Sequence, residues 1–252
     1  MMQLLTANDP EPVEWVNQTS TFPILLLCEH AGQAIPKALG DLGLPVGAIN
    51  RHIGWDIGAE ALARGIAARL SAPLIIQRYS RLVIDCNRPP HSREAVPNIS
   101  DGISIPQNVE LSESDRLARV RSIFDPMEEA LRDGFASHPR HAAFSIHSYT
   151  PQMSGGQHRP WQAGFLARAD DHTSQIMIDY IATQEPDLVL GRNEPYQLDD
   201  ASDWFIPAHA EARRLAHALI EVRNDALLKR AGVELWADLL AGAMTKVMEN
   251  MQ

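Results

Sequence analysis

The chain contains an unbroken apolar run, Pro23–Cys28, where a half-exposed strand would alternate apolar and polar residues. Strands of a parallel sheet are apolar on both faces because helices cover both sides of the sheet. The run follows a Ser/Thr cluster and ends in the polar segment Glu29–Gly32. It therefore predicts a buried strand inside a sheet that has helices on both faces.

Other strand patterns and helix patterns alternate along the chain. Strand patterns occupy residues 74–76, 82–84, 142–149, 162–167, 187–190 and 219–223, and helix patterns occupy residues 56–70, 112–135, 173–183, 208–217 and 232–248, with a kink expected at Pro126. Residues 89–109 are rich in Pro, Ser and Asn and predict a long loop. This alternation predicts an α/β fold in which residues 1–252 form a single domain around a mostly parallel or mixed sheet.

The bulk composition narrows the classes of partner and compartment. The formal net charge is −10, which argues against nucleic acid or an anionic membrane as the main partner, since both require a basic face. The only cysteines are Cys28 and Cys86, without the spacing of a disulfide framework or a cysteine zinc site. No apolar run approaches the roughly 20 residues that span a bilayer, and no signal-peptide pattern opens the chain. We therefore expect a cytoplasmic protein.

Two histidines follow predicted strands, at the sheet edge where α/β proteins place their chemistry. His30 lies in the polar turn after the first strand, and His147 ends the apolar run that begins at Ala142. Imidazole is the commonest metal-binding side chain near neutral pH. Taken singly, however, His30 is compatible with a surface turn and His147 with a hydrogen-bonded core residue.

The segment Asp85–Pro89 also follows a predicted strand. Its Asn87 and Arg88 can clamp a carboxylate, because the guanidinium offers two parallel N–H donors and the amide adds another. A structural salt bridge between Asp85 and an arginine, such as Arg81 at the start of that strand, explains the same residues equally well.

Glu221 lies within the last predicted strand, between Ile220 and Val222. A carboxylate inside a buried strand is costly unless it is paired or functional. It either pairs with an arginine or acts as a general base beside a metal-activated water. Together with the two histidines and the Asn87–Arg88 pair, it predicts a metal-dependent amide hydrolase whose substrate has a free carboxylate, with zinc as the expected metal.

Four segments carry a family resemblance: "LLLCEHAGQAIP", "HIGWDIGAEALARGIAARL", "SRLVIDCNRP" and "HSYTP". In this order they resemble the N-formylglutamate amidohydrolase family from about Ile24 to Leu227, and more distantly the zinc carboxypeptidases. The resemblance implies a phosphorylase/hydrolase-like α/β fold and a small acidic N-acyl amino acid as substrate. The implied reaction is hydrolysis of N-formyl-L-glutamate to formate and glutamate, a late step in histidine breakdown.

The resemblance also implies roles for individual residues. His30 and His147 would bind zinc, Asn87 and Arg88 would hold the α-carboxylate, and Glu221 would activate the water. Arg81 would either polarise the formyl oxygen or bind the second carboxylate of the substrate.

One position departs from the carboxypeptidase pattern, which has a glutamate three residues after the first histidine. Gln33 stands there, and a neutral amide is a poor zinc ligand. We therefore expect the carboxylate ligand to be Asp56, with Glu29 as the second candidate.

Further residues are candidates for the wall of the substrate pocket: Tyr149, His209 and Glu194, the last also as a reserve general base. His52, His91, His138, His141, His172 and His217 are interpreted as surface or helix residues. Two alternatives remain. The same scaffold would act on another N-acyl amino acid or a short peptide, or the protein would bind acidic metabolites without catalysis, having lost the metal through the Gln33 departure.

Overall fold

The sheet of this protein is mixed and has seven strands in the computed structural model, which describes residues 4–251. The strands lie in the order β1-β3-β2-β6-β9-β7-β8. Their bounds are β1 Val13–Val16, β2 Ile24–Cys28, β3 Leu74–Gln77, β6 Ala142–Tyr149, β7 Ala163–Leu166, β8 Leu190–Arg192 and β9 Ala216–Arg223. β1 pairs antiparallel with β3, and β7 pairs antiparallel with β9, whereas the central strands β3, β2, β6 and β9 are parallel. The predicted α/β class is confirmed.

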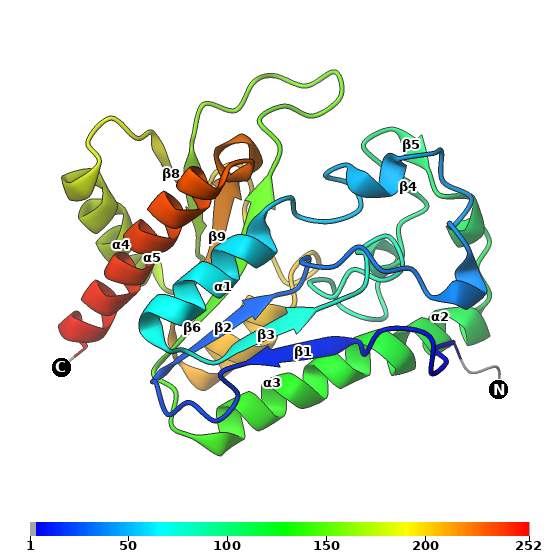
Figure 1. Cartoon of the computed structure of the whole chain (residues 1–252), viewed down its shortest axis with the longest axis horizontal. Helices are drawn as coiled ribbons and strands as arrows, with labels where there is room; N and C mark the ends of the chain where they lie inside the picture. The colour runs from blue at the N-terminus through cyan, green and yellow to red at the C-terminus, as the bar shows by residue number, and fades with distance from the viewer. Residues whose placement is uncertain (1–3, 252) are drawn as a thin grey trace.

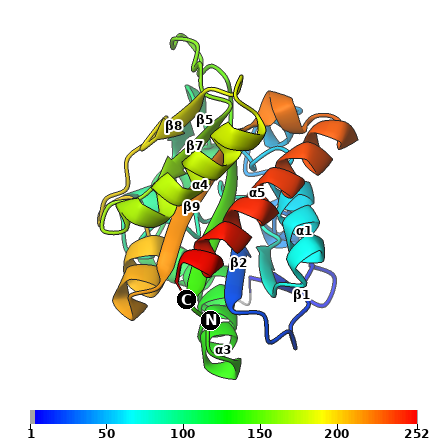
Figure 2. The same cartoon turned by 90° about the vertical axis from the view of Figure 1, so that its left-hand side faces the viewer.

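Helices cover both faces of this sheet (Figure 1 and Figure 2). On one face lie α1 Ala59–Leu70, α4 Asp171–Gln184 and α5 Arg230–Asn250, and on the other face lie α2 Glu113–Arg119 and α3 Asp125–Ser137. Within residues 4–251, no helix is both long enough and apolar enough to cross a membrane.

The apolar run of β2 is explained by these two helical layers. Ile24, Leu26 and Cys28 pack into the core beneath α1 and α5, and the alternate residues Leu25 and Leu27 pack into the core beneath α3. Successive side chains of a strand point to opposite faces. A strand covered on both sides must therefore be apolar at every position, as predicted.

The predicted strand at 82–84 is wrong, because these residues form a turn. Leu82, Val83 and Ile84 are buried in the core under α3, which accounts for their apolar character. Side chains rather than a neighbouring strand bind their carbonyls. Arg119 donates to the Val83 oxygen at 2.8 Å, and Asn108 donates to the Leu82 oxygen at 2.8 Å.

Three other boundaries differ from the predictions. The helix expected at 208–217 is two short helical turns, Ile206–Ala210 and Glu211–Arg213, and ends at Arg214 with a left-handed φ of 55°. β9 then begins at Ala216, so His217 is a buried strand residue and not a surface or helix residue. The strand expected at 187–190 is β8, which begins only at Leu190.

Two segments contain more structure or less distortion than expected. Residues 89–109 include a hairpin of β4 Ile99–Ser100 and β5 Ile103–Ser104. The helix with the expected kink at Pro126 continues from α2 through a wide helical turn, Val120–Phe124, into α3. Such a turn changes the backbone hydrogen-bond spacing just before Pro126, so the missing N–H is accommodated without a break.

The packing of α5 gives a test of the larger core. Trp236 is 2% exposed, whereas the adjacent Leu235 is 41% exposed. We expect Trp236→Ala to lower the free energy of unfolding by about 3–5 kcal/mol through the cavity it leaves. Leu235→Ala, the matched control, should change it by less than about 0.5 kcal/mol. Urea unfolding curves measure both, and equal losses would contradict the assigned packing of α5.

Candidate metal and active site

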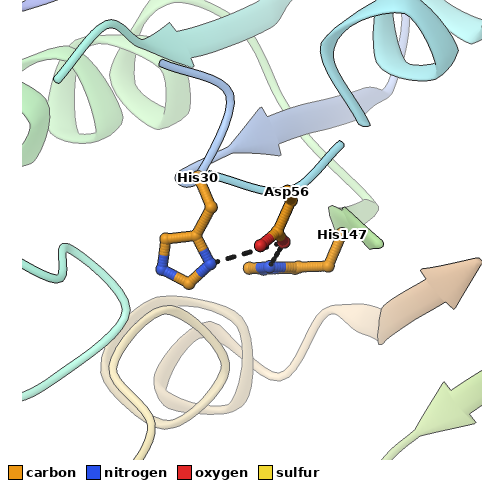
Figure 3. A group of neighbouring side chains, drawn as sticks. All are labelled: His30, Asp56 and His147. Carbon is orange, nitrogen blue, oxygen red and sulfur yellow. Dashed lines mark hydrogen bonds and ion pairs between the residues drawn. The ribbon is translucent and has the colours of Figure 1, made fainter. Parts of the chain in front are cut away.

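Three buried side chains meet at the carboxyl edge of the central strands (Figure 3). His30 lies directly after β2, His147 lies near the end of β6, and Asp56 lies in the loop before α1. The Asp56 amide donates to the His30 carbonyl at 2.9 Å, which fixes the loop against the end of β2. Parallel strands end at the same edge of a sheet. This brings Asp56 into contact with His30, 26 positions earlier, and with His147, 91 positions later.

The Asp56 carboxylate lies between the two imidazoles. Its Oδ2 is 2.9 Å from His147 Nδ1 and 3.5 Å from His30 Nδ1. His30 Nδ1 is buried and has no hydrogen-bond partner among residues 4–251. One nitrogen from each histidine and one carboxylate oxygen lie within 4.8 Å of one another. Two imidazoles and a carboxylate with an unsatisfied nitrogen fit a divalent transition metal such as zinc.

The Nε2 atoms of both histidines are held by other groups. His30 Nε2 donates to Asp85 Oδ1 at 2.7 Å. His147 Nε2 lies 2.6 Å from the Ser145 hydroxyl and 3.2 Å from Glu29 Oε2. In both rings, therefore, Nδ1 is the nitrogen that faces Asp56. Metal-binding histidines commonly donate their second nitrogen to a carboxylate in this way.

The charges of this cluster shift several pKa values. Burial acts to raise the pKa of Asp56, but the charge of His30 and the hydrogen bond from His147 lower it below its usual range. Burial likewise acts to raise the pKa of Asp85, and the charges of Arg81 and His30 outweigh it and keep that pKa well below its usual range. Both carboxyl groups are thus anionic at neutral pH.

Glu221 lies opposite His147 in the parallel register of β6 and β9. Its Oε2 atom is buried without a hydrogen-bond partner among the described residues. Burial raises the pKa of Glu221 to about 7, with the charge of His147 acting in the opposite direction and that of Asp56 adding to the rise. A carboxylate with such a pKa is suited to take up and release a proton near neutral pH.

A cavity of about 650 Å³ opens onto this cluster. His30, Asp56, His147 and Glu221 line it together with the other predicted candidates Arg81, Asn87, Arg88 and Tyr149. The structure thus gathers eight of the ten predicted site residues around one cavity.

The arginine and asparagine side chains are not equally free. Arg81 binds Asp85 through Nε and Nη2 and Asp56 through Nη1. Asn87 Oδ1 accepts from the Trp204 and Phe205 amides, and Asn87 Nδ2 donates to Asp203 Oδ1 at 3.3 Å, so one N–H of Asn87 is left for a ligand. The Arg88 guanidinium has one weak contact, 4.0 Å to Asp85, and is the freer donor.

His209 and Glu194 do not line the cavity. His209 is buried against α3, where its Nε2 donates to Glu128 at 2.9 Å. The Glu194 carbonyl lies against Gly164 of β7, and the cavity wall is instead formed by Tyr196, two residues further on. The structure therefore brings neither residue to the cavity lining, and loop order alone does not specify where a side chain lies relative to the cavity. Tyr149 lines the cavity with its ring, and its hydroxyl donates to the Trp161 carbonyl.

Gln33 is not part of the His30–Asp56–His147 cluster. Its amide donates to the Ile49 carbonyl at 3.3 Å and to Asn50 Oδ1 at 3.2 Å. The cavity also contains Arg93, which the sequence did not single out, and His52, which is half-buried in the lining although the sequence indicated a surface or helix residue. Arg93 lies in the loop predicted at 89–109, and its charge was the only signal for it.

Comparisons with known proteins agree with this arrangement. A sequence model of the family described as N-formylglutamate amidohydrolase matches residues 22–228. The crystal structure of gene product Atu2144 from Agrobacterium tumefaciens superimposes with a TM-score of 0.92 and 32% identity, over 98% of this chain and 99% of that chain. A search of curated proteins found no match.

More remote structural likenesses are weak. A bacteriophage poly-gamma-glutamate hydrolase gives a TM-score of 0.49 at 10% identity, over 98% of this chain and 93% of that chain. A metallo-carboxypeptidase from Burkholderia cenocepacia gives 0.42 at 13% identity, over 91% and 57%. The family match covers most of the chain, including the whole cluster around Asp56. The chain therefore belongs to the N-formylglutamate amidohydrolase family and is an amidohydrolase.

Proposed function

We propose that the protein hydrolyses the formamide C–N bond of N-formyl-L-glutamate, or of a closely related N-acyl acidic amino acid, to formate and the free amino acid. The observation that carries this proposal is the proximity of the His30–Asp56–His147 cluster to a buried Glu221 in one cavity, where Glu221 Oε2 has no hydrogen-bond partner in residues 4–251. Metal-assisted amide hydrolysis requires two parts. These are a set of ligands for the metal and a carboxylate that takes up a proton, here Glu221 with a pKa of about 7.

We infer that His30, Asp56 and His147 hold zinc. The buried cluster contains the carboxylates of Glu29, Asp56, Asp85 and Glu221, and Arg81 pairs with only two of them. This excess of negative charge favours a divalent cation, and two imidazoles with one carboxylate are typical zinc ligands. Bound there, zinc would act as a Lewis acid towards the substrate carbonyl and lower the pKa of water at the site.

Glu221 is the general base in this proposal. Its carboxylate takes a proton from the water that attacks the formyl carbon, which raises the nucleophilicity of the water oxygen. As the C–N bond breaks, the same proton passes to the leaving amine nitrogen, so Glu221 returns to its anionic form.

The cavity supplies positive charge for an acidic substrate. Arg88 and the remaining N–H of Asn87 would bind the α-carboxylate, and Tyr149 would form a wall beside it. Arg81 keeps Asp56 and Asp85 in place and adds positive charge near the reacting carbonyl. The second carboxylate of the substrate would bind Arg93, which lines the cavity and forms no ion pair with any residue in 4–251.

Zinc content and formate release test the main proposal. We expect the purified protein to bind zinc and to release formate from N-formyl-L-glutamate. Asp56→Asn should lose most of its zinc, because the anionic ligand is replaced by a poor one. Bound zinc without turnover would indicate a different N-acyl substrate. Tight glutamate binding with neither zinc nor turnover would favour a non-catalytic binding protein.

Glu221→Gln tests the general base. The amide cannot accept the proton from water, so kcat should fall by about 10²- to 10⁴-fold while zinc content stays unchanged. The unaltered protein should lose activity as the pH falls below about 7, because the group with the raised pKa becomes protonated. That acid limb should be absent from the residual activity of Glu221→Gln. Glu185→Gln, an exposed site at the end of α4, is the control and should behave like the unaltered protein.

Arg93→Gln tests recognition of the second carboxylate. Loss of one charged hydrogen bond should raise KM for N-formyl-L-glutamate by about 10- to 100-fold. KM for N-formyl-L-alanine, which lacks that carboxylate, should not change. An equal effect on both substrates would exclude Arg93 from this role.

A further inference from the structure

Glu29 is a buried carboxylate beside the His30–Asp56–His147 cluster, and its side chain has no exposed surface. It contacts Ser145 and His147, and no described arginine or lysine pairs with it. The comparable carboxylate beside His30, Asp85, is paired with Arg81. An isolated buried charge is costly, so Glu29 depends on Ser145 and His147 for the stabilisation of its charge.

The backbone register explains why Glu29 lies there. β2 and β6 are parallel, with Leu27 opposite Ser145. Two residues further along each strand direction, Glu29 lies beside His147. Ser145 and His147 are two positions apart on one strand and so point to the same face. This places a carboxylate, a hydroxyl and an imidazole in one line.

The hydrogen bonds that join Glu29, Ser145 and His147 have one arrangement of donors and acceptors. The Ser145 hydroxyl lies 2.8 Å and 2.6 Å from the two Glu29 oxygens. An ionised carboxylate only accepts hydrogen bonds, so the single hydroxyl proton goes to Glu29. The Ser145 oxygen must then accept from His147 Nε2, which lies 2.6 Å away. The hydrogen is thereby fixed on Nε2, and Nδ1 faces Asp56.

We propose that Glu29 is a positioning residue for the metal: it acts through Ser145 to keep His147 Nδ1 as the metal-binding atom, and it adds a negative charge that strengthens cation binding. This inference rests on the proposed zinc site and goes beyond it. Glu29 lies on the far side of the His147 ring from Asp56 and is therefore not itself a ligand.

Zinc affinity tests this role independently of turnover. Dissociation constants are measured by competition with a chromogenic chelator at one pH. We expect Glu29→Gln to bind zinc about 10- to 100-fold more weakly, because the amide removes the charge and can donate to Ser145 itself. The matched control is Glu128→Gln, which alters another carboxylate that contacts a histidine, His209, outside the cavity. Its zinc affinity should be unchanged.

A spectroscopic measurement on the unaltered protein does not depend on the variant folding. In the zinc-loaded protein with ¹⁵N-labelled histidine, we expect the His147 hydrogen on Nε2 and none on Nδ1. A hydrogen on Nδ1, or unchanged zinc affinity in folded Glu29→Gln, would overturn the role of Glu29. An unaltered protein that binds no zinc would contradict the proposed metal site instead. One that binds zinc but releases no formate would contradict only the proposed substrate, and the Glu29 test would still stand.

Discussion

The parallel pairing of β2, β6 and β9 is the constraint on which the other features of the site depend. It ends three strands at one edge and sets His147 opposite Glu221, with His30 directly beyond β2. The strands themselves are apolar, so the polar atoms are concentrated at this edge in a setting of low dielectric. Charges buried there must neutralise one another, because water cannot do so. The close arrangement of carboxylates, imidazoles and one arginine follows from that requirement.

Carboxylates dominate this cluster, and the partners of each determine its character. Asp85 has both an arginine and a histidine, and its pKa is held low. Glu221 Oε2 lacks a hydrogen-bonding partner in the part of the chain that the structure describes, and the pKa of Glu221 is raised to about 7. Two residues of the same chemical type therefore differ in their affinity for protons through environment alone. Such a separation is what proton transfer during amide hydrolysis needs, since one group must remain anionic while another changes its charge.

Much of this arrangement could be predicted from sequence, and what could not be predicted depends on loops. The apolar run of β2 and the polar residues after successive strands predicted the sheet class and the grouping of His30, Asn87, Arg88, His147 and Glu221, because strand ends share an edge. Residues 82–84 resembled a strand since burial alone makes them apolar. Loop order places His209 and Glu194 near the pocket, but it does not specify which loop side chains line the cavity. The contacts of Glu29 depend on strand register, and a single sequence does not reveal which residues of two strands lie opposite each other.

The turn at residues 80–88 contributes Arg81, Asp85, Asn87 and Arg88 to the cavity, yet no strand pairs with it. Arg119 and Asn108 bind its carbonyls from α2 and from the loop before it. The turn is also bonded to the histidine cluster, because Asp85 accepts from His30 at 2.7 Å and Arg81 donates to Asp56 at 3.2 Å. Asn87 in turn accepts from the Trp204 and Phe205 amides. The reacting centre and the anion-binding groups are therefore joined by side chains rather than by strand pairing, and this fixed spacing favours substrates of one length.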